Sequence, residues 1–251
     1  MRRSRLTVML LILALHAGWA MQTASSKDTK KPAAEKKKPN TTAPEPRDGE
    51  FWQKRHASFN ERIKKGNVDL LLIGDSITHA WENAGKEMWQ KYYEPRHAAN
   101  LGIGGDQTQH VLWRLDHGNV DGIKPKLAVL MIGTNNSGAN SPEEIADGIK
   151  AIVNKLHEKL PETKVLILAI FPRGGDKTDA KRIVNQKTNE IIKKLDNGST
   201  VRYLDIGPKF LNDDETLSKE IMPDLLHLSP KGYAIWAESI EPTVKEMMGE
   251  K

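Results

Sequence analysis

Short polar and glycine-rich segments of this chain hold residues whose types suit acyl transfer. Ser76 lies in Gly-Asp-Ser, Gly105 in Gly-Ile-Gly-Gly, Asn135 in Gly-Thr-Asn-Asn, and Asp224 and His227 in Asp-Leu-Leu-His. A serine hydroxyl can attack an ester carbonyl when a histidine takes its proton and a carboxylate orients that histidine. A backbone N–H and a side-chain amide can hold the oxyanion that forms. Together these residues predict the hydrolysis of an ester.

Each of the first three segments follows an apolar run that predicts a buried strand. The runs in this chain cover residues 68–73, 97–101, 127–132, 164–171 and 200–206. The first, third and fourth runs are continuous rather than alternating, which is typical of strands buried on both faces of a parallel sheet. Because ligands bind outside the carboxyl ends of such strands, Ser76, Gly105 and Asn135 are expected to converge at that edge.

Helical stretches alternate with the strands and predict a single α/β domain. They are expected at residues 51–65, 79–91, 143–160, 177–195 and 230–248. The third has the clearest start signal, because Ser141 can cap it, a proline follows in the first turn, and Glu144 stands three residues after the cap. Ser229 is expected to cap the last helix in the same way.

Each candidate residue also has a structural interpretation when it is taken alone. Ser76 has the position of a helix N-cap, and Gly105 that of a tight turn. Asn135 suits a turn, and so do Asp224 and His227 together. Catalysis is favoured by their joint occurrence on elements that share one sheet edge. The chain lacks the Gly-x-Ser-x-Gly elbow of α/β-hydrolases, and its glycine run lacks dinucleotide-binding spacing, so neither of those sites is expected.

Further residues in these segments are candidates for contact with the substrate, namely Asp75, Asp106, Asn136 and Arg173. A turn or a salt bridge is the alternative role for each of them. The histidines are scattered and the chain has no cysteine, so a metal site is not expected. No cofactor is expected either, because no nucleotide-binding motif is present.

The N-terminus has the features of an export signal. Three arginines precede an apolar run at residues 6–15, and small residues follow, which predicts a signal peptide over residues 1–20. An uncleaved signal anchor is the alternative. No later hydrophobic stretch has spanning length, so the protein is expected to be secreted or periplasmic.

Residues 21–48 are rich in Lys, Pro, Ala, Thr and Ser and nearly lack large apolar side chains. Such a segment is expected to be a disordered linker, followed by the folded domain over residues 49–251. The first 48 residues carry a net charge of +6 and the remaining 203 a net charge of −1, within the total of +5. The folded part is therefore not expected to bind nucleic acid. The basic linker suits either an anionic envelope surface or a solvated spacer.

These motifs resemble those of the SGNH, or GDSL, esterase/lipase superfamily. The run Asn-Leu-Gly-Ile-Gly-Gly-Asp-Gln-Thr-Gln-His-Val-Leu-Trp-Arg-Leu at residues 100–115 is similar to the platelet-activating-factor acetylhydrolase Ib branch of that superfamily. So are Gly-Thr-Asn-Asn and Phe-Pro-Arg-Gly at residues 171–174. Asn136 stands where other members of the superfamily have aspartate, as it does in this branch. The resemblance covers residues 51–248.

The resemblance implies a flavodoxin-like, three-layer α/β/α fold with five parallel strands in the order 2-1-3-4-5. It implies that Ser76 is the nucleophile and that Asp224 and His227 complete the triad. The oxyanion donors would be the N–H groups of Ser76 and Gly105 and the side chain of Asn135. Relatives in this branch also suggest a homodimer.

Exported relatives that remove acetyl groups from sugars fit the expected compartment better than cytosolic members that act on ether phospholipid. The expectation is therefore a serine esterase that cleaves short acyl esters, with O-acetylated carbohydrate, small or polymeric, as its substrate. The first alternative is a lysophospholipase, a thioesterase or a platelet-activating-factor-type acetylhydrolase, which would share the site. The second is a non-catalytic domain that binds the envelope or carbohydrate. The chain has no large apolar lid insertion, which disfavours a long-chain lipase.

Overall fold

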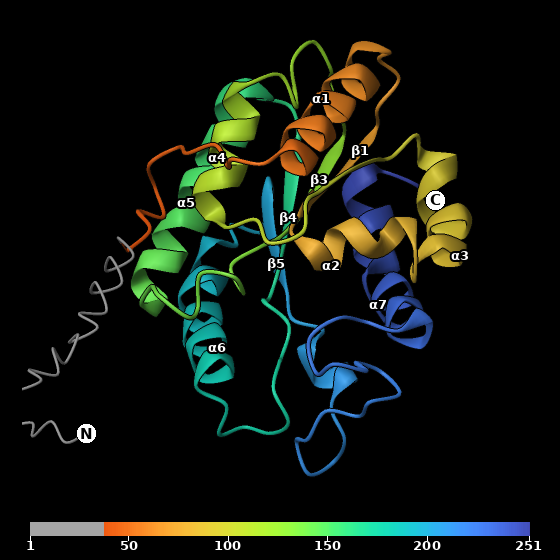
Figure 1. Ribbon diagram of the computed structural model, residues 1–251. Helices are drawn as coiled ribbons and strands as arrows, with labels where there is room; N and C mark the ends of the chain where they lie inside the picture. Colours follow the sequence, from red (N-terminus) through yellow and green to blue (C-terminus); the bar gives the residue numbers. More distant parts are fainter. Residues whose placement is uncertain (1–37) are drawn as a thin grey trace, which may run out of the picture. The chain divides into compact units, whose positions relative to one another are not determined.

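The computed structural model describes residues 38–251, so the predicted signal peptide and the first part of the predicted linker lie outside the described residues. One parallel sheet lies at the centre of the domain (Figure 1). Its strands are β1 (Leu70–Gly74), β2 (Ala99–Gly102), β3 (Leu127–Met131), β4 (Lys164–Leu168) and β5 (Val201–Leu204). Their order is β2-β1-β3-β4-β5, which confirms the predicted fold.

Helices cover both faces of this sheet (Figure 1). One face carries α1 (Glu50–Lys64), α4 (Thr108–Asp116), α5 (Pro142–Lys159) and α6 (Ala180–Ile192). The other carries α2 (Ser76–His79), the short α3 (Lys86–Met88) and the C-terminal α7 (Pro230–Met248). Short 3₁₀ or π turns complete the described elements at Ala80–Glu82, Trp89–Tyr93, Glu94–Arg96, Lys193–Leu195 and Gly207–Phe210.

The continuous apolar strands serve two hydrophobic cores. Leu71 and Ile73 of β1 pack under α1, α4 and α5, whereas Leu70 and Leu72 pack against α2 and α7. This division follows from the strand period of two, which sends successive side chains to opposite faces. Burial of each such side chain contributes roughly 1.5–3 kcal/mol to the stability of the fold. The helices on both faces therefore stabilise the sheet whose strand ends carry the candidate residues.

Both predicted helix caps are confirmed. The Ser141 hydroxyl accepts from Glu144 N at 3.3 Å, and the Glu144 carboxylate accepts from Ser141 N at 2.8 Å, which completes a capping box on α5. The Ser229 hydroxyl accepts from Gly232 N at 3.2 Å at the start of α7. The cap at Ser229, two residues after His227, fixes where α7 begins.

The observed helices differ from the predicted ones in two places. The helix expected at residues 79–91 is broken into α2, a 3₁₀ turn, α3 and a π turn. Gly85 explains part of this, because a Cβ there would lie 2.5 Å from the ring of Trp81, which the bend packs into the core. In addition, α4 was not predicted, although Val111, Leu112 and Leu115 stand at helical spacing and are buried.

The predicted disordered linker is wrong for residues 38–48, which we call the N-terminal strap. The Thr41 hydroxyl donates to Glu144 O at 2.6 Å, and Thr41 O accepts from the Thr108 hydroxyl at 2.9 Å. Thr41 is only 4% exposed, because the strap lies against α4 and α5. The segment is held by polar contacts rather than by apolar burial, so its composition gave no sign of order. No helix within residues 38–251 is both long and apolar enough to cross a membrane.

Candidate active site

Ser76 stands at the carboxyl end of β1, as the first residue of α2. Asp75 caps this short helix, since its carboxylate accepts from Ile77 N at 3.0 Å. Gly74 allows the end of β1 to lie close to the neighbouring strand, because a Cβ at this position would lie 2.3 Å from the carbonyl oxygen of Met131. The strand-to-helix turn therefore leaves the Ser76 side chain half-buried at the sheet edge.

His227 and Asp224 reach Ser76 from the loop that precedes α7. His227 Nε2 lies 2.9 Å from Ser76 Oγ, and His227 Nδ1 lies 2.6 Å from Asp224 Oδ2. The second carboxylate oxygen of Asp224 accepts from the backbone N–H groups of Leu226 and His227, at 3.1 and 2.7 Å. The three side chains thus form one hydrogen-bonded chain, in which the imidazole can take the serine proton.

The loop between Asp224 and His227 is held in an uncommon backbone conformation. Leu225 has φ of 61°, in the left-handed region that β-carbon-bearing residues rarely adopt. Its carbonyl accepts from Gly174 N at 2.9 Å, and its own N–H donates to Met222 O at 2.9 Å. The bond from Gly174 holds the loop against the segment after β4, and the bond to Met222 closes a turn within the loop, so together they fix the direction from which His227 approaches Ser76.

The electrostatics keep Asp224 ionised. Partial burial acts to raise the pKa of its carboxyl, but the hydrogen bonds from the imidazole and backbone of His227 outweigh it and hold the pKa below its usual value. The side chains of His227 and Asp224 are 41% and 56% exposed, so this part of the site is open to water. An ionised carboxylate beside Nδ1 can stabilise the imidazolium that forms during proton transfer.

The two other predicted oxyanion donors lie at the ends of the neighbouring strands. Gly105 is exposed and has φ of +80°, in the loop after β2. Asn135 follows β3 and is held at two points, since Asn135 Nδ2 donates to Asp106 O at 2.9 Å and Asn135 O accepts from Gln107 Nε2 at 2.8 Å. Within residues 38–251 the second amide hydrogen of Asn135 has no acceptor, so it is free to meet an oxyanion. The N–H of Ser76, in the first turn of α2, also lacks an intrahelical acceptor.

Asp106 is completely buried, which contradicts the prediction that it contacts the substrate. Its carboxylate accepts from Arg114 Nε at 2.9 Å, from Trp52 Nε1 at 2.8 Å and from Arg47 Nη1 at 3.1 Å. Arg114 is buried as well, so the ion pair is shielded from water. Asp106 instead braces the loop that carries Gly105.

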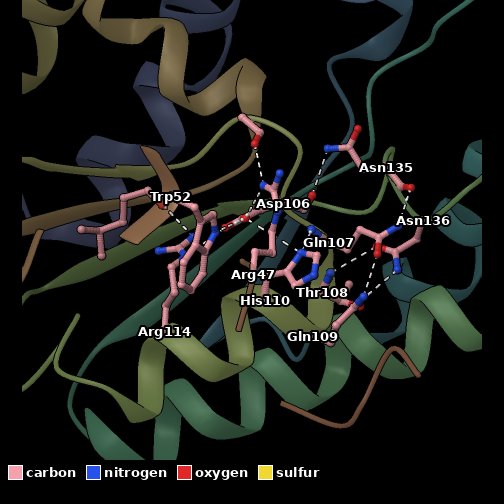
Figure 2. Close-up of polar contacts among 12 residues, drawn as sticks. Arg47, Trp52, Asp106, Gln107, Thr108, Gln109, His110, Arg114, Asn135 and Asn136 are labelled. Atoms are coloured by element: carbon pink, nitrogen blue, oxygen red, sulfur yellow. Dashed lines mark hydrogen bonds and ion pairs between the residues drawn. The ribbon is translucent and has the colours of Figure 1, made fainter. Parts of the chain in front are cut away.

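Asn136 is also buried, which contradicts the prediction that it contacts the substrate. Asn136 Oδ1 accepts from Thr108 N at 3.1 Å, and Asn136 Nδ2 donates to Asn140 Oδ1 at 3.2 Å (Figure 2). It joins the start of α4 to the turn after β3. Arg173 is half-buried and donates to Thr134 Oγ1 at 3.0 Å, so it supports that same turn, and its contact with substrate stays a prediction.

Asp75, unlike Asp224, is fully buried beside the nucleophile, which contradicts the prediction that it contacts the substrate. Burial raises the pKa of Asp75 to about 7, which the Asp106 carboxylate reinforces, against the hydrogen bond from Ile77 N. Within residues 38–251 its second oxygen has no hydrogen-bond partner. Because the folded pKa of Asp75 lies above its unfolded value, the contribution of this carboxyl to stability is fully present below about pH 4 and is lost as the pH rises through 7.

Replacing Asp75 with Asn is therefore expected to stabilise the protein at pH 8 and not at pH 4. The asparagine oxygen can still accept from Ile77 N, while the charge disappears. The expected gain in free energy of unfolding at pH 8 is roughly 1–3 kcal/mol, after the cost of a buried unpaired amide N–H. Urea unfolding at both pH values measures it, with Asp179→Asn as a control, since half-buried Asp179 caps α6 by a similar bond. An equal effect of Asp75→Asn at both pH values would show that the Asp75 carboxyl does not change its charge between pH 4 and pH 8 in the folded protein.

The main residue that the sequence did not reveal is Arg47. It lies in a segment whose other basic residues are all lysines, and that isolated arginine was the available signal. The three expected triad residues, by contrast, lie within hydrogen-bonding distance of one another at the end of β1. Within residues 38–251, no group of three or more His, Asp or Glu side chains is arranged to hold a metal ion.

Comparison with known proteins finds a matching family model and similar sequences. A model of the GDSL-like lipase/acylhydrolase family matches residues 72–235, a span that includes Ser76 and His227. The platelet-activating factor acetylhydrolase IB subunit alpha2 of Rattus norvegicus is 38% identical over 200 residues, which are 79% of this chain and 86% of that protein.

Solved structures show the same fold. A GDSL-like lipase from Bacteroides thetaiotaomicron aligns with a TM-score of 0.62 and 19% identity, over 77% of this chain and 97% of that chain. A carbohydrate acetylesterase from Sinorhizobium meliloti aligns with a TM-score of 0.58 and 17% identity, over 72% of this chain and 99% of that chain. At such identities the likeness concerns the arrangement of the elements.

Proposed function

The chain belongs to the GDSL-like lipase/acylhydrolase family and is a carboxylic ester hydrolase, and from this premise we propose that it removes short acyl groups, chiefly O-acetyl groups, from carbohydrate. The observation that carries the proposed mechanism is the hydrogen-bonded chain from Ser76 through His227 to Asp224. A serine so placed at a sheet edge, with amide donors from neighbouring strand ends, suits acyl transfer.

In the first half of the proposed reaction, Ser76 Oγ attacks the ester carbonyl carbon while its proton passes to His227 Nε2. The carbonyl oxygen becomes an oxyanion and accepts from the N–H groups of Ser76 and Gly105 and from the amide of Asn135. The bond to the alcohol then breaks, and the imidazolium gives its proton to the departing oxygen. The product of this half is an acyl group on Ser76.

In the second half, water replaces the alcohol. His227 takes a proton from the water, whose oxygen attacks the acyl carbon, and the oxyanion forms again at the same donors. When the bond to Ser76 Oγ breaks, His227 returns the proton to the serine. The exposure of the His227 side chain supports this step, because water reaches the imidazole directly.

Two observations support a short acyl group. The relative that is 38% identical over most of both chains is named for an acetyl substrate. The Asp224–His227 side of the site is open, and within residues 38–251 no long apolar segment covers it, whereas a long acyl chain calls for a deep apolar pocket.

Support for carbohydrate as the alcohol comes from the expected export and from an exposed aromatic side chain. Phe51 is 63% exposed and stacks on the ring of His79, with centroids 6.0 Å apart and planes 19° apart. His79 ends the helix that Ser76 begins, so the pair lies beside the nucleophile. A flat apolar face at the edge of a polar site suits the C–H face of a sugar ring.

The proposal extends to location and assembly. The predicted signal would deliver the enzyme to the periplasm or the medium, and the basic residues that follow it would serve as a solvated spacer or contact an anionic envelope surface. A homodimer is proposed from the resemblance alone. The second candidate function is a platelet-activating-factor-type acetylhydrolase, which the 38% identity favours and which differs in the alcohol rather than in the acyl group.

The acyl group and the alcohol can be tested separately with the purified full chain. We expect kcat/KM on p-nitrophenyl acetate to exceed that on the octanoate by roughly 10- to 100-fold, because the site offers little apolar surface to a long chain. Acetate should be released from acetylated xylan faster than from a 2-acetyl ether phospholipid. Higher activity on octanoate would instead favour a lysophospholipase or thioesterase, and activity confined to the phospholipid would favour the second candidate.

A further inference from the structure

Arg47 of the N-terminal strap lies against the backbone of the glycine-rich loop (Figure 2). Its Nη1 donates to Gly104 O at 2.7 Å. The guanidinium atoms lie 3.1 to 3.5 Å from the point where a Cβ on Gly105 would stand. The Arg47 side chain is 33% exposed, so it covers this loop from the solvent side.

The bonded carbonyl belongs to the same peptide group as the proposed oxyanion donor. Gly104 C=O and Gly105 N–H share one planar trans peptide, and they point in opposite directions. A donor that holds the oxygen therefore sets the direction of the N–H. The positively charged guanidinium beside that oxygen also polarises the peptide and strengthens its N–H as a donor.

We propose that Arg47 is a positioning residue of the oxyanion hole, which orients and polarises the Gly105 N–H; this inference rests on the proposed function. Two adjacent glycines give the backbone little steric preference, so the peptide between them can rotate unless another group holds it. Arg47 supplies that hold from a segment outside the sheet and helices. The catalytic unit therefore includes the N-terminal strap.

A second contact links Arg47 to the other oxyanion donor. Its Nη1 also lies 3.1 Å from Asp106 Oδ1, and the carbonyl of Asp106 accepts from Asn135 Nδ2 at 2.9 Å. Arg114 and Trp52 donate to the same carboxylate from within the core. Asp106 thus keeps two buried partners when Arg47 is removed, so we expect the loss of Arg47 to affect catalysis more than folding.

The test compares three variants of the full chain, Arg47→Met, Arg47→Lys and Lys38→Met, with the wild type. Arg47→Met is expected to lower kcat on p-nitrophenyl acetate by about 10- to 100-fold while KM changes less than about twofold, because the contact acts on the developing charge. Arg47→Lys keeps the charge and should fall between Arg47→Met and the wild type. Lys38→Met is the matched control and should keep full activity, since Lys38 lies on the same strap as Arg47 but pairs with Glu144 of α5, at 2.7 Å.

Chemical rescue separates positioning from a merely structural role. Guanidinium chloride at a sub-denaturing concentration should restore part of the kcat of Arg47→Met, and sodium chloride at equal ionic strength should not. The inference about Arg47 would be overturned if Arg47→Met had the wild-type kcat, or if its loss of kcat accompanied a lower melting temperature and was not rescued. If Ser76→Ala is inactive in the same assay, either result leaves the proposed function standing. A wild-type chain without esterase activity would overturn the proposed function itself.

Discussion

Replacing Ser76 with alanine is expected to lower kcat on p-nitrophenyl acetate by about 10⁴-fold or more while the fold stays intact. Ser76 Oγ is the hydroxyl that lies 2.9 Å from His227 Nε2, so its loss removes the atom that would form the acyl-enzyme. Stability should change little, because alanine suits the first turn of α2 and Asp75 still accepts from Ile77 N.

The measurement combines rates with covalent labelling. A fluorophosphonate should add one phosphonyl group to the wild type and none to Ser76→Ala, as seen by mass spectrometry of the intact chain. Ser58→Ala is the control, since Ser58 lies in α1 and donates only to Arg55 O in an exposed position. Residual activity above about 1% in Ser76→Ala, or labelling of another serine, would rule out the proposed nucleophile.

The positions of the catalytic side chains were predictable because they depend on strand ends. Continuous apolar runs mark the strands, and each strand end delivers the next polar residue to one edge of the sheet. Ser76 therefore lies at the end of β1 and Asn135 follows the neighbouring β3. His227 meets Ser76 from the loop before a helix whose cap at Ser229 is itself visible in the sequence.

The bracing contacts were not predictable, because they join residues far apart in sequence and leave no periodic pattern. Asp106 was a candidate for substrate contact, and nothing in its neighbourhood reveals that Trp52 and Arg47 reach it from more than 50 positions away. The order of the N-terminal strap was not predictable for the same reason, since polar bonds such as that of Thr41 to Glu144, and not apolar burial, hold it against the domain. Amino-acid composition indicates how much apolar surface a segment can bury, but it does not indicate such hydrogen bonds.

Replacing Asp224 with asparagine is expected to lower kcat by about 10² to 10³-fold, because it fixes the wrong tautomer of His227. One side-chain oxygen of Asp224 already accepts from the N–H groups of Leu226 and His227. The asparagine oxygen must keep this role, so its NH₂ group has to face His227 Nδ1. An imidazole that accepts at Nδ1 carries its proton on Nε2, where it meets Ser76 as a donor and cannot take the serine proton.

The expected loss is smaller than the roughly 10⁴-fold cost of such a change at a buried aspartate, because the Asp224 side chain is 56% exposed and water can replace part of its field. Steady-state kinetics on p-nitrophenyl acetate measure it, with Asp69→Asn as the matched control. Asp69 forms an exposed pair with His97, in which Nδ1 and Oδ2 lie 2.9 Å apart, away from the site, and its replacement should leave kcat unchanged. If Asp224→Asn lost less than about tenfold, His227 would keep its working tautomer without the carboxylate, and the hydroxyl–imidazole pair alone would have to account for the catalysis.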